Sequence, residues 1–188
     1  MTKYILHGGY TRIKNESNKM FFKEILSSFN KSVKILFIFF ARPEKDWEMR
    51  EKREKNHLKT ARPDLQLNFK VANKDAATLE KQILESDVIY IIGGENKPLI
   101  NKLKNIKDLK DLFKDKVIVG SSAGAYALST YYYSHEAKGI FDGLGILPIK
   151  TLAHYSPLLE NNLEELKAYK EKLDTYAIEE TKHIVLEK

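Results

Sequence analysis

The chain alternates between short apolar runs and amphipathic stretches, and this alternation constrains the fold more than any other feature. Uninterrupted or alternating apolar runs predict strands, whereas apolar residues spaced three or four apart predict helices. Five strand-then-helix units in series predict a mostly parallel, twisted sheet with helices on both faces, a three-layer α/β fold. The predicted strands of these units are 4–6, 33–40, 65–71, 87–92 and 117–119.

Length and composition narrow the class of protein. With 188 residues, 43% of them hydrophobic, residues 1–188 are expected to form a single domain. The longest apolar run, 35–41, is too short to cross a membrane, and the N-terminus has no signal-peptide pattern. We therefore expect a cytoplasmic protein without a membrane partner, acting as a monomer or homodimer. The chain has no cysteine, which excludes a thiolate nucleophile and cysteine metal sites, and no pattern predicts a metal or a cofactor.

The net charge of +6 does not predict a nucleic-acid partner. Lysines alternate with acidic residues along 44–59 and 101–116, as on the solvated face of a helix. The densest basic segment, 50–59, contains no interleaved aromatic residues that could stack on bases.

The segment 117–125 reads as a buried strand, a Gly-x-Ser-x-Gly turn and a helix. This pattern is typical of a nucleophile elbow with Ser122 at its tip. The turn is so sharp that side chains two residues either side of the serine would collide, so glycine or alanine is expected there, and this chain has Gly120 and Gly124. The turn also leaves the N–H of Ala123 at a helix N-terminus, where it can receive an oxyanion.

Two other predicted strands end in glycine pairs, Gly8-Gly9 after His7 and Gly93-Gly94 after Ile92. Because ligands gather at the carboxyl ends of parallel strands, these ends and the elbow predict a site at one edge of the sheet.

A serine nucleophile needs a base, and histidine is the usual one. Of the five histidines, His57 lies on the charged helix, while His183 and His135 have ordinary surface or strand positions. We favour His154, in the predicted loop 152–157 downstream of the elbow, over His7, which could line the pocket.

The region after the elbow is less regular. Residues 131–133 predict a strand, 143–148 predict a turn feeding a short strand, and four leucines predict a last amphipathic helix. Residues 176–178 and 183–186 predict a closing C-terminal β-hairpin around 179–182.

Several motifs in this order resemble the peptidase E (aspartyl dipeptidase) and cyanophycinase family of serine peptidases. The matching segments are 91–96, 120–125, 141–148 followed by His154, and 177–180. The resemblance implies the flavodoxin-like fold of class I glutamine amidotransferases. It also implies hydrolysis of short peptides by a serine, a histidine and an acid.

The resemblance assigns roles within the glycine-rich loop 93–96. A backbone N–H at Gly94 or Glu95, beside Gly93 and Asn96, is expected to join that of Ala123 in holding the oxyanion. Glu95 also brings a carboxylate that could hold a substrate α-amino group.

The same resemblance implies that Glu180 is the acid that orients His154. Its place after the histidine argues against an ordinary α/β-hydrolase, in which the acid precedes the histidine. Asp142 and Glu136 are the alternative acids, and Glu179 is a weaker one.

The substrate is less well defined than the reaction. The family's aspartyl dipeptidases use an arginine soon after the catalytic histidine to hold the substrate's aspartate, and this chain has no arginine after Arg62. We predict a serine dipeptidase or exopeptidase acting on short peptides. The alternatives are a hydrolase of isoaspartyl or cyanophycin-derived dipeptides and a non-catalytic α/β protein that binds a ligand or a partner.

Overall fold

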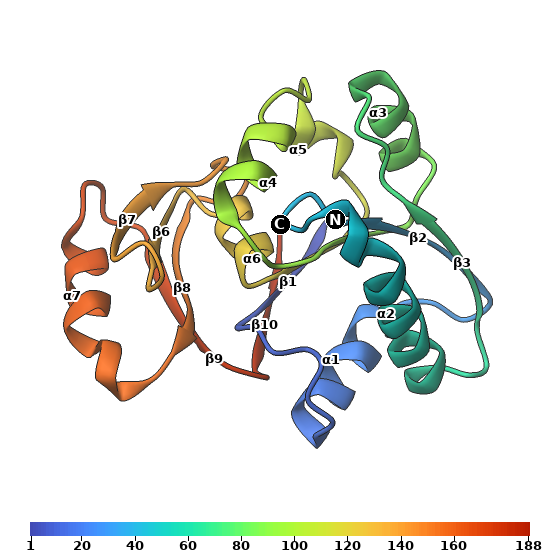
Figure 1. Ribbon diagram of the computed structural model, residues 1–188, viewed down its shortest axis with the longest axis horizontal. Helices are drawn as coiled ribbons and strands as arrows, with labels where there is room; N and C mark the ends of the chain where they lie inside the picture. The colour runs from blue at the N-terminus through green and yellow to red at the C-terminus, as the bar shows by residue number, and fades with distance from the viewer.

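A six-stranded sheet forms the centre of the computed structural model, which describes residues 1–188 (Figure 1). The strand order is β10-β1-β5-β4-β2-β3, and only β10 is antiparallel to its neighbour. This arrangement confirms the predicted three-layer α/β fold. The strands are β1 (Lys3–His7), β2 (Ser32–Ile38), β3 (Gln66–Val71), β4 (Val88–Ile91), β5 (Val117–Ser121) and β10 (His183–Glu187).

Helices cover both faces of this sheet. One face packs against α1 and α2, and the other packs against α3 to α6. Helices α1 and α3 begin where Asn15 and Asp75 accept hydrogen bonds from the backbone N–H groups of Asn18 and Thr78, as N-caps do. The helices are α1 (Glu16–Ile25), α2 (Trp47–Ala61), α3 (Ala76–Leu84), α4 (Asn96–Leu103), α5 (Leu109–Leu112) and α6 (Ala123–Leu128).

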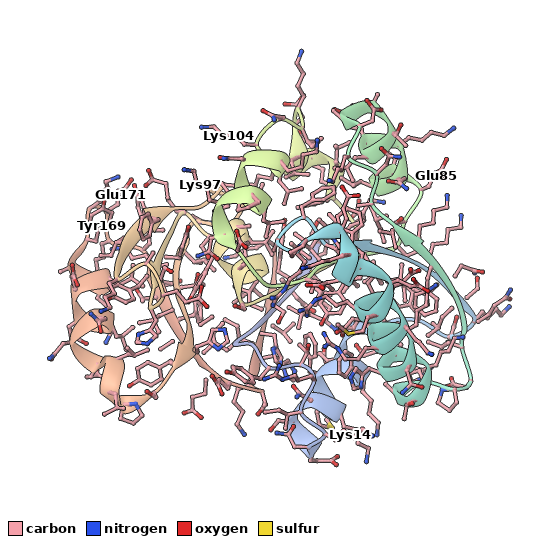
Figure 2. The ribbon with its side chains drawn as sticks, viewed as in Figure 1. Lys14, Glu85, Lys97, Lys104, Tyr169 and Glu171 are labelled. Carbon is pink, nitrogen blue, oxygen red and sulfur yellow. The ribbon has the colours of Figure 1, made fainter.

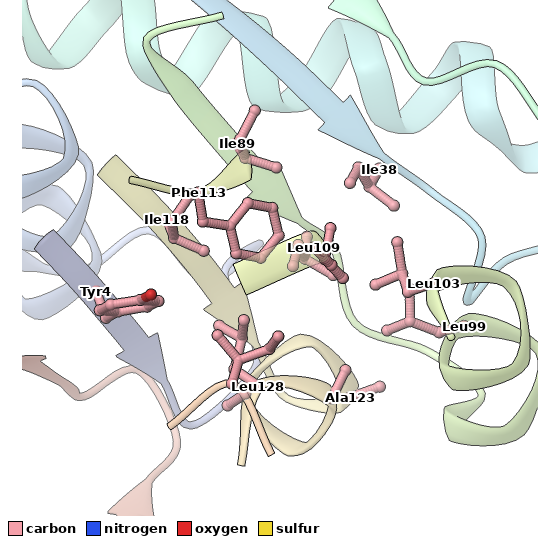
Figure 3. Close-up of a cluster of buried hydrophobic side chains, with 14 of the residues drawn as sticks. Tyr4, Ile38, Ile89, Leu99, Leu103, Leu109, Phe113, Ile118, Ala123 and Leu128 are labelled. Atoms are coloured by element: carbon pink, nitrogen blue, oxygen red, sulfur yellow. The ribbon is translucent and has the colours of Figure 1, made fainter. Parts of the chain in front are cut away.

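The core divides into two main clusters because successive side chains of each strand point to opposite faces. The larger cluster has 25 buried residues, and Figure 3 shows part of it. In that cluster Ile118 of β5 and Ile89 of β4 meet Phe113, while Ala123 of α6 lies in the same cluster. Burial of these side chains fixes the register of β5 and α6, and therefore the position of the turn between them.

A second, four-stranded sheet has the order β7-β6-β8-β9. Strands β6, β8 and β9 run parallel to one another, and a separate cluster of leucine and tyrosine side chains joins this sheet to α7. Its elements are β6 (Tyr131–Ser134), β7 (Gly139–Asp142), β8 (Ile149–Tyr155), α7 (Glu160–Ala168) and β9 (Asp174–Glu179).

The predicted closing hairpin is wrong. The two final strands exist, but β9 pairs with β8 in the smaller sheet, whereas β10 pairs with β1 in the larger one. The turn 180–182 therefore connects two sheets, and each final strand pairs with a strand that is distant from it in the sequence. The helices of the structure are all too short or too polar to cross a lipid bilayer.

Candidate active site

The elbow has the predicted strand-turn-helix form. Strand β5 ends at Ser121, Ser122 has the uncommon backbone angles φ 51° and ψ −112°, and α6 begins at the next residue. A Cβ on Gly120 would lie 2.7 Å from the backbone of Gly124, and a Cβ on Gly124 would lie 2.3 Å from the carbonyl oxygen of Ile91, so neither position has room for a side chain. Strained backbone of this kind concentrates at functional sites.

The imidazole of His154 lies against the serine. Its Nε2 is 2.9 Å from Ser122 Oγ, a hydrogen-bond distance. His154 was predicted in a loop, but it belongs to β8, at a bulge where its φ is 57°. The bulge breaks the in-and-out alternation of the strand and so directs this side chain toward the elbow.

The carboxylate of Glu180 lies on the other side of the ring. Its Oε1 is 3.2 Å from His154 Nδ1, and its side chain is 46% exposed. Glu180 begins the turn between β9 and β10. The structure therefore brings together the three side chains that the sequence pointed to, in the order serine, imidazole, carboxylate.

Residues 7–9 hold these three segments in place through backbone hydrogen bonds. The carbonyl of His7 accepts from the N–H of Ser122, and the carbonyl of Gly8 accepts from the N–H of His154, both at 2.9 Å. The carbonyl of Gly9 accepts from the N–H of Thr181 at 3.0 Å, beside Glu180. One short loop after β1 therefore sets the relative positions of all three segments.

The side chain of His7 is not part of the pocket surface. It is fully buried, its Nδ1 accepts from the N–H of Gly9, and its Nε2 lies 2.8 Å from Asn18 Oδ1. Because Nδ1 accepts, the proton is on Nε2, which donates to Asn18. Burial lowers the pKa of His7 to about 4. His7 thus shapes the loop and does not face a substrate.

The backbone N–H groups of Ala123 and Gly94 lie near the serine and have no hydrogen-bond acceptor in the protein. The N–H of Glu95, which was an alternative, donates instead to the carbonyl of Ala41 at 2.9 Å. The side chain of Arg42 donates from Nε to the carbonyl of Gly93 at 2.6 Å. Since the peptide is trans, this bond turns the N–H of Gly94 to the opposite side.

The remaining predicted residues lie at varying distances from the centre. Asn96 lines a cavity and lies 3.5 Å from the hydroxyl of Ser134. Glu136 lines a cavity beside Ser122, but it forms no hydrogen bond with either ring nitrogen of His154. Asp142 is exposed on β7, pairs with Lys170 and lines neither cavity, which argues against it as the acid.

Two cavities include Ser122 and His154 in their linings. One has a volume of about 590 Å³, and we call it the arginine cavity because Arg12, Arg42, Arg50 and Arg53 line it. The second cavity, of about 350 Å³, is lined by polar and apolar side chains and has no arginine or lysine. Its side-chain lining includes Tyr126, Ser134, His135, Leu158, Leu159 and Glu180. No group of three or more histidine or carboxylate side chains is placed to hold a metal ion.

Sequence reasoning missed the four arginines. It searched for a substrate-binding arginine only after His154 and interpreted 44–59 as a solvated helix. The chain has only five arginines against 27 lysines, and this rarity of arginine is the sequence signal that could have drawn attention to them.

Comparison with known proteins places this geometry in a family. The model of peptidase family S51 matches residues 4–188. The chain belongs to peptidase family S51. This membership makes it a serine-type peptidase, a hydrolase.

Solved structures of peptidases have the same fold as this S51 peptidase. A peptidase from an acI-B1 Actinobacterium superimposes with a TM-score of 0.73 at 17% identity, over 98% of this chain and 83% of that one. A putative peptidase E from Listeria monocytogenes EGD-e gives a TM-score of 0.68 at 19% identity, over 99% and 94% of the two chains. A search of curated proteins found no match.

Proposed function

We propose that this S51 peptidase hydrolyses short peptides, as a dipeptidase or exopeptidase, with Ser122, His154 and Glu180 as its catalytic triad. The observation that carries the proposal is the single imidazole that bridges Ser122 Oγ at 2.9 Å and Glu180 Oε1 at 3.2 Å. A base oriented by an acid and bonded to the nucleophile is the arrangement that acyl transfer needs.

In the proposed reaction His154 Nε2 takes the proton of Ser122 as Oγ attacks the substrate carbonyl. Glu180 accepts a hydrogen bond from Nδ1–H, which keeps Nε2 as the acceptor and stabilises the imidazolium that forms. The N–H groups of Ala123 and Gly94, free of protein acceptors, receive the developing oxyanion.

The second half of the reaction uses the same groups in reverse. His154 gives its proton to the leaving amine, so that the C–N bond breaks and an acyl ester on Ser122 remains. A water molecule then attacks this ester with His154 as base, which releases the acid and restores the hydroxyl.

The sizes of the two cavities support a short substrate. The two cavities that share Ser122 in their linings have volumes of about 590 and 350 Å³, which fall in the range of small-ligand sites and together suit a few residues. The bulge at His154 and the loop 8–10 form part of the boundary of the site.

The test is hydrolysis of a library of dipeptides and tripeptides by the purified protein and by Ser122→Ala. We expect cleavage of short peptides that Ser122→Ala abolishes without a change in melting temperature. Cleavage that survives this substitution would overturn the assignment. Preferred cleavage of β-linked aspartyl dipeptides would instead identify the isoaspartyl form of the same chemistry.

A second pair of variants tests the acid. Glu180→Gln should lower kcat by about 10²-fold, the lower end of what a positioned acid–base pair contributes. Glu179→Gln removes an equal charge one residue away, where no bond to His154 exists, and should leave kcat unchanged. Equal rates for the two variants would exclude Glu180 from the triad.

A further inference from the structure

The arginine cavity concentrates one residue type to a degree that composition does not explain. Four of the five arginines of the chain line it, whereas none of the 27 lysines does. Most lysines instead lie on the exterior, as Lys14, Lys97 and Lys104 do in Figure 2. A guanidinium, unlike an ammonium group, presents a planar pair of N–H donors that matches a carboxylate.

The four guanidiniums reach the cavity from separate parts of the fold. Arg12 follows β1, Arg42 follows β2, and Arg50 and Arg53 lie one turn apart on α2. The parallel sheet brings these segments to the carboxyl edge where Ser122 lies. The arrangement therefore comes from the tertiary fold and not from one basic segment.

Most of this positive charge has no partner within the protein. Arg53 pairs with the buried Glu54 at 2.8 Å, but Arg12, Arg42 and Arg50 form no ion pair. The Nε atom of Arg50 is buried without a hydrogen-bond acceptor. A buried donor of this kind costs free energy until an acceptor arrives.

Mutual repulsion adds to this cost. Burial, followed by the charge of Arg53, lowers the pKa of Arg42. Burial, followed by the charges of Arg42 and Arg53, lowers the pKa of Arg50. The carboxylates of Glu95 and Glu136 line the same cavity but only partly offset the four guanidiniums. A bound anion would relieve the remaining repulsion.

We propose that the arginine cavity binds a carboxylate of the substrate, with Arg50 and Arg42 as the main contacts, while the rest of the peptide crosses Ser122 into the second cavity. The second cavity contains no arginine or lysine, so the two sides of the scissile bond are distinguished by charge. The inference rests on the proposed peptide substrate. The carboxylate can be the C-terminus of the peptide or an acidic side chain.

Binding to the inactive Ser122→Ala variant tests the inference without relying on turnover. The probes are alanyl-alanine, its C-terminal amide, and alanyl-glutamate amide, titrated by calorimetry. The only tryptophan, Trp47, donates from Nε1 to the carbonyl of Arg42 at 3.0 Å, so its fluorescence provides a second readout. We expect at least one carboxylate-bearing probe to bind about 10-fold more tightly than alanyl-alanine amide.

The added substitutions Arg50→Gln and Lys52→Gln form a matched pair. Both remove one positive charge from α2, but Lys52 is exposed and does not line the cavity. Arg50→Gln should abolish the preference for a carboxylate, and Lys52→Gln should preserve it. Tighter binding of alanyl-alanine assigns the C-terminal carboxylate, and tighter binding of alanyl-glutamate amide assigns the side chain.

Equal affinity of all three probes, or a preference that survives Arg50→Gln, would overturn the inference. Either result would leave the triad intact if the active protein still cleaves peptides. Conversely, a carboxylate preference in a protein that cleaves nothing would support the cavity while contradicting the proposed function. The experiments can therefore contradict either proposal without contradicting the other.

Discussion

Gly9 shapes the proposed triad without contributing a side chain to it. Its φ is +112°, a conformation that side chains other than hydrogen rarely allow. A Cβ at this position would lie 2.2 Å from His154 Cε1 and 2.6 Å from Nε2. The imidazole thus occupies the space that any other residue at position 9 would fill.

Gly9→Ala should therefore lower the rate of peptide hydrolysis by at least about 10²-fold, because displacing a reacting group by about 1 Å costs that much. Gly145→Ala is the control, since Gly145 also has a positive φ, of 64°, but no atom lies within 4 Å of its would-be Cβ. Gly145→Ala should lose about 1 kcal/mol of stability from backbone strain, and Gly9→Ala should lose more because its Cβ must also displace the imidazole. Wild-type activity in Gly9→Ala would show that the ring position is not critical.

Strand β10 is the element that ties the acid-bearing turn to the larger sheet. It pairs antiparallel with β1, and the N–H of Gly8 donates to the carbonyl of Lys182, which extends the same ladder into the turn. Thr2 and Lys188 form both backbone hydrogen bonds with each other. Because hydrogen-bonded and non-hydrogen-bonded pairs alternate along an antiparallel ladder, Tyr4 and Leu186 are also a hydrogen-bonded pair. Glu187 therefore directs its N–H away from β1.

Leu186→Pro should destabilise the protein by about 1–3 kcal/mol, because it removes a ladder hydrogen bond. It should also reduce hydrolysis by loosening the turn that holds Glu180. Leu186→Ala separates the lost packing from the lost bond, and Glu187→Pro should melt near the wild type. Chemical denaturation and kcat measure the two effects, and equal melting of both proline variants would contradict this pairing.

The pairing of β10 could not be predicted from local sequence patterns. The elbow at Ser122 is a local feature, so its glycine spacing predicted the turn, and the residue-level argument for His154 also selected the imidazole that contacts it. The partners of β9 and β10 depend on edges formed by β8 and β1, far away in the chain. Nearness in sequence therefore suggested a hairpin that the sheets do not form.

At the scale of the whole molecule, the arginine cavity is a product of topology that no local pattern reveals. Arg12 and Arg53 are 41 positions apart, and helical spacing on α2 fits a solvated face equally well. Their convergence depends on the parallel sheet bringing the ends of β1 and β2, and the helix α2 that follows β2, to one edge. Local sequence patterns could therefore suggest the elbow at Ser122, but they could not suggest a cavity whose arginines come from separate segments.

Global stability should fall as the solution is acidified from pH 6.5, because burial, complete for His7 and partial for His57 and His183, disfavours protonation of three histidines in the folded protein. Burial lowers the pKa of His7 to about 4 and also lowers those of His57 and His183. In the unfolded chain each histidine binds a proton near pH 6.5. Between these values the unfolded state binds more protons, so the free energy of unfolding decreases as the pH falls and recovers above about pH 6.5.

The contribution of His7 can be isolated with His7→Asn, whose amide oxygen can still accept from the N–H of Gly9. The other titrating groups are common to both proteins, so their effects cancel in the difference. From pH 6.5 to pH 5 the wild type should lose about 1.5 kcal/mol more unfolding free energy than the variant. Urea denaturation at the two pH values measures this, and parallel pH profiles would mean that His7 is protonated as readily in the folded protein as in the unfolded chain.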